Sequence, residues 1–309
     1  MIFRFSRKVA RAACFLLVVR LFMGCQPENP VSDPVVPGEE IIRIPVVVHV
    51  LYNKDEFNIS DEKIASQLAV LNQDFRKKNP DHTATPAEFA HLVADVGIEF
   101  YLATKDPDGK PTSGITRTRS TVDGWDGKTP GAQQPIDDLA LYFTSQGGHD
   151  AWPADRYLNI WVAELSNRNG ELALAGYAQF PGGDARLDGV VVDPRVFGTL
   201  PPLVEEHRLG RTTTHEIGHW LNLIHIFANS GNCQSTDQVD DTPAASGPYT
   251  GKPTYPQYAC GQSSLFMNFM DNVDDEAMYM FTSGQKARMR AVFAPGGGRE
   301  ALYKALKSQ

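Results

Sequence analysis

The hydrophobic positions of the chain predict a strand-rich first half. Residues Ile41 to Tyr52 are mostly apolar and β-branched, which is typical of a buried strand at the centre of a sheet. Apolar or alternating runs predict four further strands, at residues 96–104, 157–164, 173–180 and 189–193. Periodicity alone therefore indicates a mixed α/β domain with an apolar sheet.

Helical spacing predicts the elements that cover this sheet. Ser60 is placed to cap a helix that buries the stripe Ile64, Leu68, Leu71 and Phe75 and ends near Arg76. A second helix is expected at about residues 205–222, and two more at 285–293 and 299–306. The segments 124–135 and 226–265 are rich in Gly, Pro, Asn and Asp without periodicity, and are expected to be irregular.

The first 25 residues differ from the rest in composition. Four basic residues precede an apolar run from Ala12 to Met23, which is too short for a spanning helix and predicts a signal peptide at residues 1–24. The run ends in Leu-Phe-Met-Gly-Cys25, which resembles a bacterial lipoprotein cleavage box with Cys25 as the lipidated residue. Ordinary cleavage and release is the alternative. The proline-rich residues that follow, up to residue 40, read as a tether to a domain at 41–309.

Charge and cysteine content narrow the possible partners. Removal of residues 1–24 takes away five positive charges and no acid, and so moves the net charge from −8 to −13. An acidic surface argues against nucleic-acid binding. Only Cys233 and Cys260 remain in the domain, and in an oxidising compartment they most simply pair, with two buried free thiols as the alternative.

One stretch carries the chemistry, from Arg211 to His225. His215 and His219 are spaced i, i+4 and lie on one face of a helix, where two imidazoles can bind one metal ion. Glu216 is adjacent and can take the proton of a metal-bound water. Such short motifs also occur by chance in buried helices, but a third histidine, His225, follows six residues later. Because a straight helix would turn His225 away from the other two, the helix has to end and the chain reverse. Three neutral imidazoles and a water form the open tetrahedral site of catalytic zinc.

The sequence HEIGHWLNLIH resembles the zinc-binding motif of the metzincin metalloproteases. With Asp240-Asp241-Thr242-Pro243 and Asn268-Phe269-Met270-Asp271, it resembles the pappalysin family and its bacterial cytophagalysin branch, over about residues 44–302. The resemblance implies a zincin of the α/β (α+β) type: a twisted mixed sheet, a backing helix, a zinc-binding helix and an irregular C-terminal subdomain with a Met-turn. The expected upper subdomain is 41–225 and the lower one 226–309.

The resemblance also assigns roles to residues around the motif. The family has Gly three residues after the second His, and Asn222, which tolerates the same left-handed conformation, stands there. Met270 corresponds to the Met-turn residue under the zinc, although its apolar neighbours also suit a plain core turn. The family usually has Tyr two residues later, near the metal or the oxyanion. Asn272 stands there instead, and its amide is a hydrogen-bond donor.

Two acidic segments suggest further binding sites. Asp237, Asp240, Asp241 and the carbonyl of Thr242 are hard oxygen donors at calcium-like spacing. A solvated acidic turn is an equally good reading of the spacing, but the resemblance implies structural calcium near this segment. Asp274, Asp275 and Glu276 follow the Met-turn and suggest a preference for Arg or Lys after the cut, with a solvated loop as the alternative.

The leading interpretation is an exported zinc endopeptidase, either a cell-envelope lipoprotein or extracellular. It would hydrolyse protein or peptide substrates with one zinc ion and a structural calcium ion, as a monomer that contacts the membrane only through Cys25. One alternative is a zincin in which a downstream Glu replaces His225 as third ligand. The other is an inactive surface lipoprotein that binds peptides or glycans, against which the intact Glu216 argues.

Overall fold

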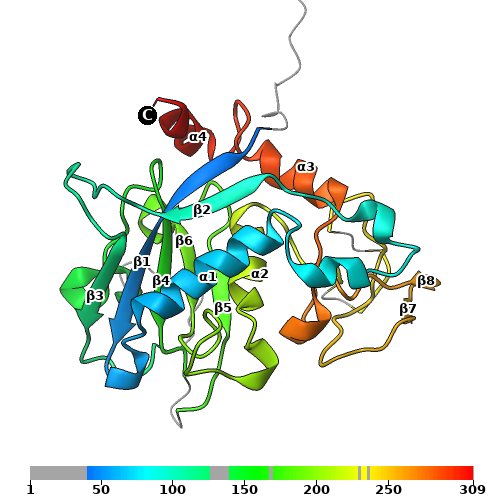
Figure 1. Cartoon of the computed structure of the whole chain (residues 1–309), viewed down its shortest axis with the longest axis horizontal. Helices are drawn as coiled ribbons and strands as arrows, with labels where there is room; N and C mark the ends of the chain where they lie inside the picture. Colours follow the sequence, from blue (N-terminus) through cyan, green and yellow to red (C-terminus); the bar gives the residue numbers. More distant parts are fainter. Residues whose placement is uncertain (1–39, 126–138, 167–169, 229–230, 235–236, 309) are drawn as a thin grey trace, which may run out of the picture. The chain divides into compact units, whose positions relative to one another are not determined.

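The computed structural model describes residues 40–125, 139–166, 170–228, 231–234 and 237–308. Within these ranges, the main sheet has the strand order β2-β1-β4-β6-β5, and β3 also pairs with β1 (Figure 1). All pairs are parallel except β5 with β6, which is antiparallel. Its strands are β1 Ile42–Tyr52, β2 Ile98–Leu102, β3 Ile115–Arg119, β4 Leu158–Ala163, β5 Gly176–Ala178 and β6 Gly189–Val192.

Strand β1 is central, as its apolar sequence predicts. Its first half pairs with β2 and its second half with β3 on one side, while β4 pairs with it on the other. Val46 and Val47 point to opposite faces and both are fully buried, so the sheet is covered on both sides at this strand.

Helices α1 (Asp61–Asp74) and α2 (Arg211–Trp220) contribute to one apolar core with one face of the sheet. Ser60 caps α1 by accepting a hydrogen bond from the amide of Lys63, as expected. Ile64 and Leu71 of α1 and Ile217 of α2 are fully buried there. Figure 1 shows α1 crossing in front of the strands, with α2 beside β5. The metal-binding helix is therefore held between the backing helix and the edge of the sheet.

The predicted start of the metal-binding helix at residue 205 is wrong. Residues Glu205–His207 form a separate 3-10 turn, and Gly210, with φ of 74°, breaks the chain direction before α2 begins. The carboxylate of Asp275 accepts hydrogen bonds from the amides of Leu209 and Arg211, at 2.9 and 3.1 Å. A carboxylate satisfies the free amides at a helix start, so Asp275 fixes where α2 begins.

The remaining predicted elements lie within a few residues of their expected positions, but β3 and the hairpin of β7 and β8, which lies in the segment expected to be irregular, were not predicted. Helices α3 (Ser283–Ala291) and α4 (Glu300–Lys307) close the chain, and β7 (Tyr258–Ala259) pairs with β8 (Gln262–Ser263) in a small hairpin. Helix α4 contacts the start of the sheet, since Tyr303 and Lys307 both bind the carboxylate of Glu40. Short 3-10 turns occupy Asp55–Phe57, Pro80–Ala84, Ala90–Leu92, Ala140–Tyr142, Thr144–Gln146, Ala185–Leu187, Glu205–His207 and Asp275–Ala277.

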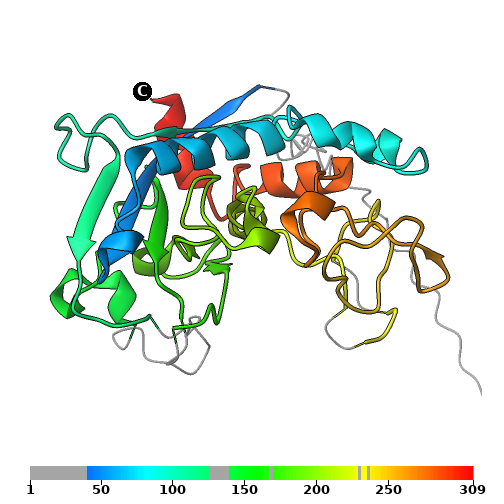
Figure 2. The ribbon, with the colours of Figure 1, turned by 60° about the horizontal axis from the view of Figure 1, so that its bottom comes forward.

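The irregular segment after α2 is fastened by a disulfide and by its own apolar residues. Cys233 and Cys260 form the expected bridge, with a Cα–Cα distance of 5.5 Å. Met267, Phe269 and Met270 are fully buried beneath this segment. Figure 2 shows the segment extending away from the sheet as a series of loops.

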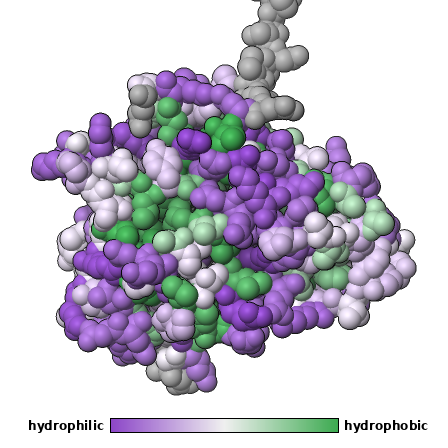
Figure 3. Space-filling view, in the orientation of Figure 1, coloured by the Kyte–Doolittle hydropathy of each residue, from purple (hydrophilic) through white to green (hydrophobic). Residues whose placement is uncertain are grey.

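Hydrophilic residues cover most of the face shown in Figure 3. No helix among the described residues is long and apolar enough to cross a membrane. The predicted signal peptide, Cys25, most of the tether and most of the loop at 124–135 lie outside the described residues.

Candidate active site

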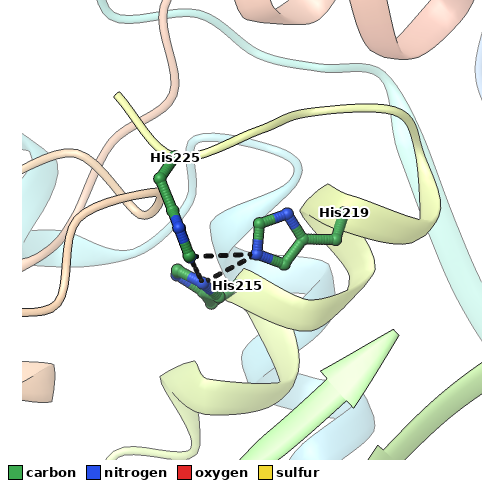
Figure 4. Close-up of side chains that lie close together, drawn as sticks. All are labelled: His215, His219 and His225. Atoms are coloured by element: carbon green, nitrogen blue, oxygen red, sulfur yellow. Dashed lines mark hydrogen bonds between the residues drawn. The ribbon is translucent and has the colours of Figure 1, made fainter. Parts of the chain in front are cut away.

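The structure brings together the three predicted metal ligands, His215, His219 and His225, named here the zinc triad (Figure 4). Their Nε2 atoms lie 3.1, 3.1 and 3.2 Å from one another. Nitrogen ligands about 2.0–2.1 Å from a tetrahedral zinc ion lie roughly 3.3 Å apart, so the triad is close to a coordinating geometry.

The hydrogen bonds of the other ring nitrogens explain why the Nε2 atoms face inward. Nδ1 of His215 lies 2.7 Å from the carbonyl oxygen of Phe269, and Nδ1 of His219 lies 2.7 Å from that of Leu223. A carbonyl only accepts, so these Nδ1 atoms carry the proton and the Nε2 lone pairs are free.

Burial keeps the triad neutral. It lowers the pKa of His215 and His219, and it lowers the pKa of His225 to about 4. Three neutral rings that point lone pairs at one another repel unless a cation lies between them. The residues present therefore fit a zinc ion.

The turn that carries the third ligand forms as the sequence predicts. Helix α2 ends at Trp220, and Asn222 takes a left-handed conformation with φ of 75°. The chain then passes Leu223, whose carbonyl holds His219, and reaches His225, whose ring stacks on Phe227 at 4.6 Å. Residues 220–225 are called the zinc turn below.

Glu216 lies beside the triad and packs against strand β5. It is buried, and burial raises the pKa of its carboxyl to about 8. A Cβ atom on Gly176 would lie 3.0 Å from Cγ of Glu216 and 2.9 Å from the carbonyl oxygen of Val191. Only glycine fits without a shift at this point. Sequence reasoning missed this role, although a glycine inside an apolar strand signals a close approach of another group.

Met270 lies under the metal-binding helix. A Cβ atom on Gly218 would lie 2.5 Å from its Sδ atom, so the helix and the methionine are in direct contact. The preceding residue, Phe269, supplies the carbonyl that holds His215. This places the segment around Met270 where the resemblance expects the Met-turn.

A cavity of about 470 Å³ opens over the triad and Glu216. Residues 174–178, which include β5, form one wall, and the half-exposed Phe180 lies near its rim with its ring 5.4 Å from that of His219. The other lining residues include His207, Thr212, Asp271, Asn272, Val273 and Met278. Of these, sequence reasoning had identified only Asn272.

The acidic residues expected near the substrate lie elsewhere, and two of them have other partners. Asp274, Asp275 and Glu276 are not among the residues that line the cavity. Asp275 binds the start of α2, and Glu276 pairs with Arg208 and Lys252. Besides Glu216, the acid that lines the cavity is Asp271, which is buried and whose pKa burial raises to about 7.

Residues 237–242 are named here the acidic loop, and all of them except Gln238 line a second cavity of about 610 Å³. Asp241 accepts hydrogen bonds from the hydroxyl of Thr282 and the amide of Gly284, at 2.6 and 2.7 Å, and so binds the start of α3. Asp237 accepts from Thr242 through one oxygen. Its other oxygen is buried and has no partner in the part of the chain that the structure describes.

A protein-family comparison matches residues 143–294 to the peptidase M43 model, described as pregnancy-associated plasma protein-A. An extracellular metalloprotease of the fungus Pyricularia oryzae is 30% identical over 285 residues, which cover 87% of this chain and 81% of the relative. Another, from Verticillium alfalfae, is 39% identical over 244 residues, covering 75% and 68%.

Solved structures give a closer match over the described fold. Mature mirolysin of Tannerella forsythia, in complex with a cleaved peptide, is 40% identical, with a TM-score of 0.79 over 87% of this chain and 98% of that one. A promirolysin variant of the same organism is 40% identical with a TM-score of 0.80, covering 88% and 87%.

Proposed function

The chain belongs to the M43 pappalysin family of metzincin zinc metalloproteases, and we propose that it is exported and cuts extracellular proteins by means of Glu216. It is a metalloendopeptidase with an intact zinc triad. The observation that carries the proposal is the convergence of three neutral imidazoles and a buried carboxylate at the base of one cavity.

His215, His219 and His225 would hold the zinc ion. When bound, zinc polarises the scissile carbonyl, lowers the pKa of the attacking water and favours the ionised form of a nearby carboxylate. Glu216 then accepts the proton of that water and donates it to the leaving amine. Its burial supports this second step, because a carboxyl with a raised pKa retains a proton readily until the amine is formed.

Strand β5 supplies a place for the substrate backbone. It is the last strand in the sheet order, so its outer edge is not paired with another described strand. An extended peptide can add to such an edge through backbone hydrogen bonds. Since Gly176 of β5 contacts Glu216, a peptide bound along β5 would pass over the general base.

Asn272 is proposed to donate a hydrogen bond to the carbonyl oxygen as negative charge develops there. It is exposed on the cavity wall, two residues after Met270. A neutral amide is a weaker donor than an acidic hydroxyl, so turnover lower than that of relatives with Tyr at this position is expected.

A preference for a basic residue after the cut remains our proposal, but the structure changes its basis. Asp271 lines the cavity, whereas Asp274, Asp275 and Glu276 do not. One oxygen of Asp271 is buried and has no hydrogen-bond partner among the described residues. A guanidinium or ammonium group of the substrate would supply that partner.

Calcium binding by the acidic loop is also a proposal. The support is the buried, unpartnered oxygen of Asp237 beside Asp240 and Thr242 on one cavity wall. Asp241 is a poorer ligand than the sequence suggested, because both of its oxygens already accept hydrogen bonds from the region of α3.

We further propose that a signal peptide directs the chain across the membrane and that Cys25 anchors it by a lipid, with residues up to 40 as tether. The support is the Leu-Phe-Met-Gly-Cys sequence and the extracellular nature of the curated relatives. The mature protein is expected to act as a monomer on protein substrates.

The test compares wild type with Glu216→Ala on residues 26–309. Bound zinc is quantified, and cleavage of a fluorogenic peptide library is followed with calcium present. One zinc ion in both proteins and a loss of turnover of about 10²–10⁴-fold in the variant is the expected result. Zinc in both with cleavage in neither would favour the peptide-binding or glycan-binding lipoprotein, and no zinc in either would refute the site.

A further inference from the structure

Two arginines near the end of the chain bind the carbonyl groups of the zinc turn. Nε of Arg299 donates to the carbonyl oxygen of Trp220 at 2.8 Å, and Nε of Arg288 donates to that of Asn222 at 2.7 Å. Between these two carbonyls along the chain lies Leu221, and directly after them comes Leu223, which holds the imidazole of His219.

These carbonyls lie at the last residue of α2 and just beyond it, where the helix offers no amide to pair with them. The last carbonyl groups of any α-helix have no amide in the next turn. Here the amide of Leu221 donates to the carbonyls of Ile217 and Gly218, that of Asn222 to His219, and that of Leu223 to Gly218. The carbonyls of Trp220 and Asn222 accept from the two arginine side chains instead.

The two contacts differ in their surroundings. Arg299 is buried, forms two 2.9 Å hydrogen bonds with Asp188, and lies 3.6 Å from the centre of the Trp220 ring. Its removal would leave the buried carboxylate of Asp188 without its cationic partner and with only the indole N–H of Trp220 as a side-chain donor, which damages the fold itself. Arg288 is half-buried, and its second contact is to the side chain of Gln238 at 3.1 Å.

We propose that Arg288 is a positioning residue for the zinc site. It holds Asn222 in the left-handed conformation through which the chain reverses between His219 and His225. Loss of this bond would leave Leu223 held only by its amide bond to Gly218, would loosen the carbonyl that sets the ring of His219, and would shift His225 relative to the other ligands. The proposal depends on the zinc triad and not on peptide cleavage, because it concerns metal binding alone.

Helix α3 offers a matched control in Arg290, two residues further on. It is buried, and it also donates to backbone carbonyls, those of Val96, Gly97 and Glu40. These carbonyls lie just before β1 and β2, and none of them belongs to the zinc turn. Arg290→Gln thus removes a guanidinium that binds backbone carbonyls from the same helix, at a site that does not contact the triad.

The experiment measures the dissociation constant for zinc, by competition with a chelator, on the full chain carrying Arg288→Gln, Arg288→Lys or Arg290→Gln. Thermal unfolding of each metal-free protein is recorded alongside. We expect Arg288→Gln to weaken zinc binding about 10–100-fold, as for other residues that orient metal ligands. Arg290→Gln should lower the melting temperature more and leave zinc affinity within about twofold of wild type. Arg288→Lys, which retains one donor, should recover part of the affinity.

The visible spectrum of the cobalt-substituted protein gives an independent readout of ligand geometry. Arg288→Gln should alter its d–d bands, whereas Arg290→Gln should not. Unchanged zinc affinity and an unchanged spectrum in Arg288→Gln would overturn the proposal. Equal weakening of zinc binding by Arg288→Gln and Arg290→Gln would also overturn it, because the effect would then follow general stability.

Discussion

The zinc triad and the acidic loop were both predicted from ligand spacing, yet they present their ligand atoms in different ways. In the triad, backbone carbonyls fix the rings of His215 and His219, and three lone pairs converge. In the acidic loop, both oxygens of Asp241 accept hydrogen bonds from residues at the start of α3, and Asp240 is exposed. One carboxylate oxygen of the loop, from Asp237, is buried without a partner among the described residues. The groups behind the ligands, more than the ligand types, distinguish a formed metal site from an acidic segment.

The sharpest test of the tight support around the triad is Gly176→Ala. The added methyl group would meet Glu216 and the carbonyl of Val191, and should displace either the general base or the edge strand. We expect kcat/KM for a fluorogenic peptide to fall about 10–100-fold while zinc content stays the same. Gly182→Ala is a suitable control, since a Cβ there meets nothing within 4 Å and only its φ of 86° adds strain. Wild-type activity in Gly176→Ala would show that Glu216 does not need this contact.

The loss of stability in acid should separate protonation of the triad from protonation of His49 in the sheet. His49 is a residue of β1 whose ring is hydrogen-bonded to Asn159, and burial lowers its pKa from 6.5 to about 3. Below pH 6.5 the unfolded chain binds a proton that the folded chain does not, so the free energy of unfolding falls as the pH falls. By pH 5 this amounts to about 2 kcal/mol.

The measurement is denaturant unfolding of wild type and His49→Gln at pH 8 and pH 5, with saturating zinc and with chelator. The loss due to His49 should persist with zinc and shrink in the variant. Any additional loss that appears only with chelator belongs to the triad, whose imidazoles are also held neutral by burial. Identical pH dependence in wild type and His49→Gln would contradict the assignment to His49.

The smallest expected effects test the acidic loop. Asp241→Asn should lower the free energy of unfolding by about 1 kcal/mol with or without calcium, because it weakens bonds at the start of α3. Asp237→Asn should instead remove the increase in melting temperature that added calcium gives to wild type. If calcium does not raise the melting temperature of wild type, the calcium proposal fails, while the role of Asp241 is unaffected.

What could be predicted from the sequence was mostly local. The triad is encoded within eleven residues, and the reversal at Asn222 follows from spacing and from the tolerance of Asn for the left-handed region. Strand β1 and helix α1 were predicted from periodicity and a cap because those signals lie inside the elements themselves.

What could not be predicted depends on residues that are distant in sequence. The start of α2 is set by Asp275, which follows it by more than sixty residues. The contact of Gly176 with Glu216 and that of Arg288 with Asn222 likewise arise only once the sheet and the helices have packed. The same long-range contacts explain why Asp241 and Asp275, free acids by sequence, have hydrogen-bonding partners in the fold.

The two arginine contacts to the zinc turn also bear on when the protein can become active. Arg288 and Arg299 follow the turn that they hold by more than sixty residues. Synthesis and export proceed from the N-terminus, so a nascent chain contains all three histidines long before it contains these supports. A ribosome-bound or truncated chain would carry the complete motif without a properly held metal site. Proteolytic competence would therefore be delayed until Arg288 and Arg299 have emerged, well after the zinc ligands.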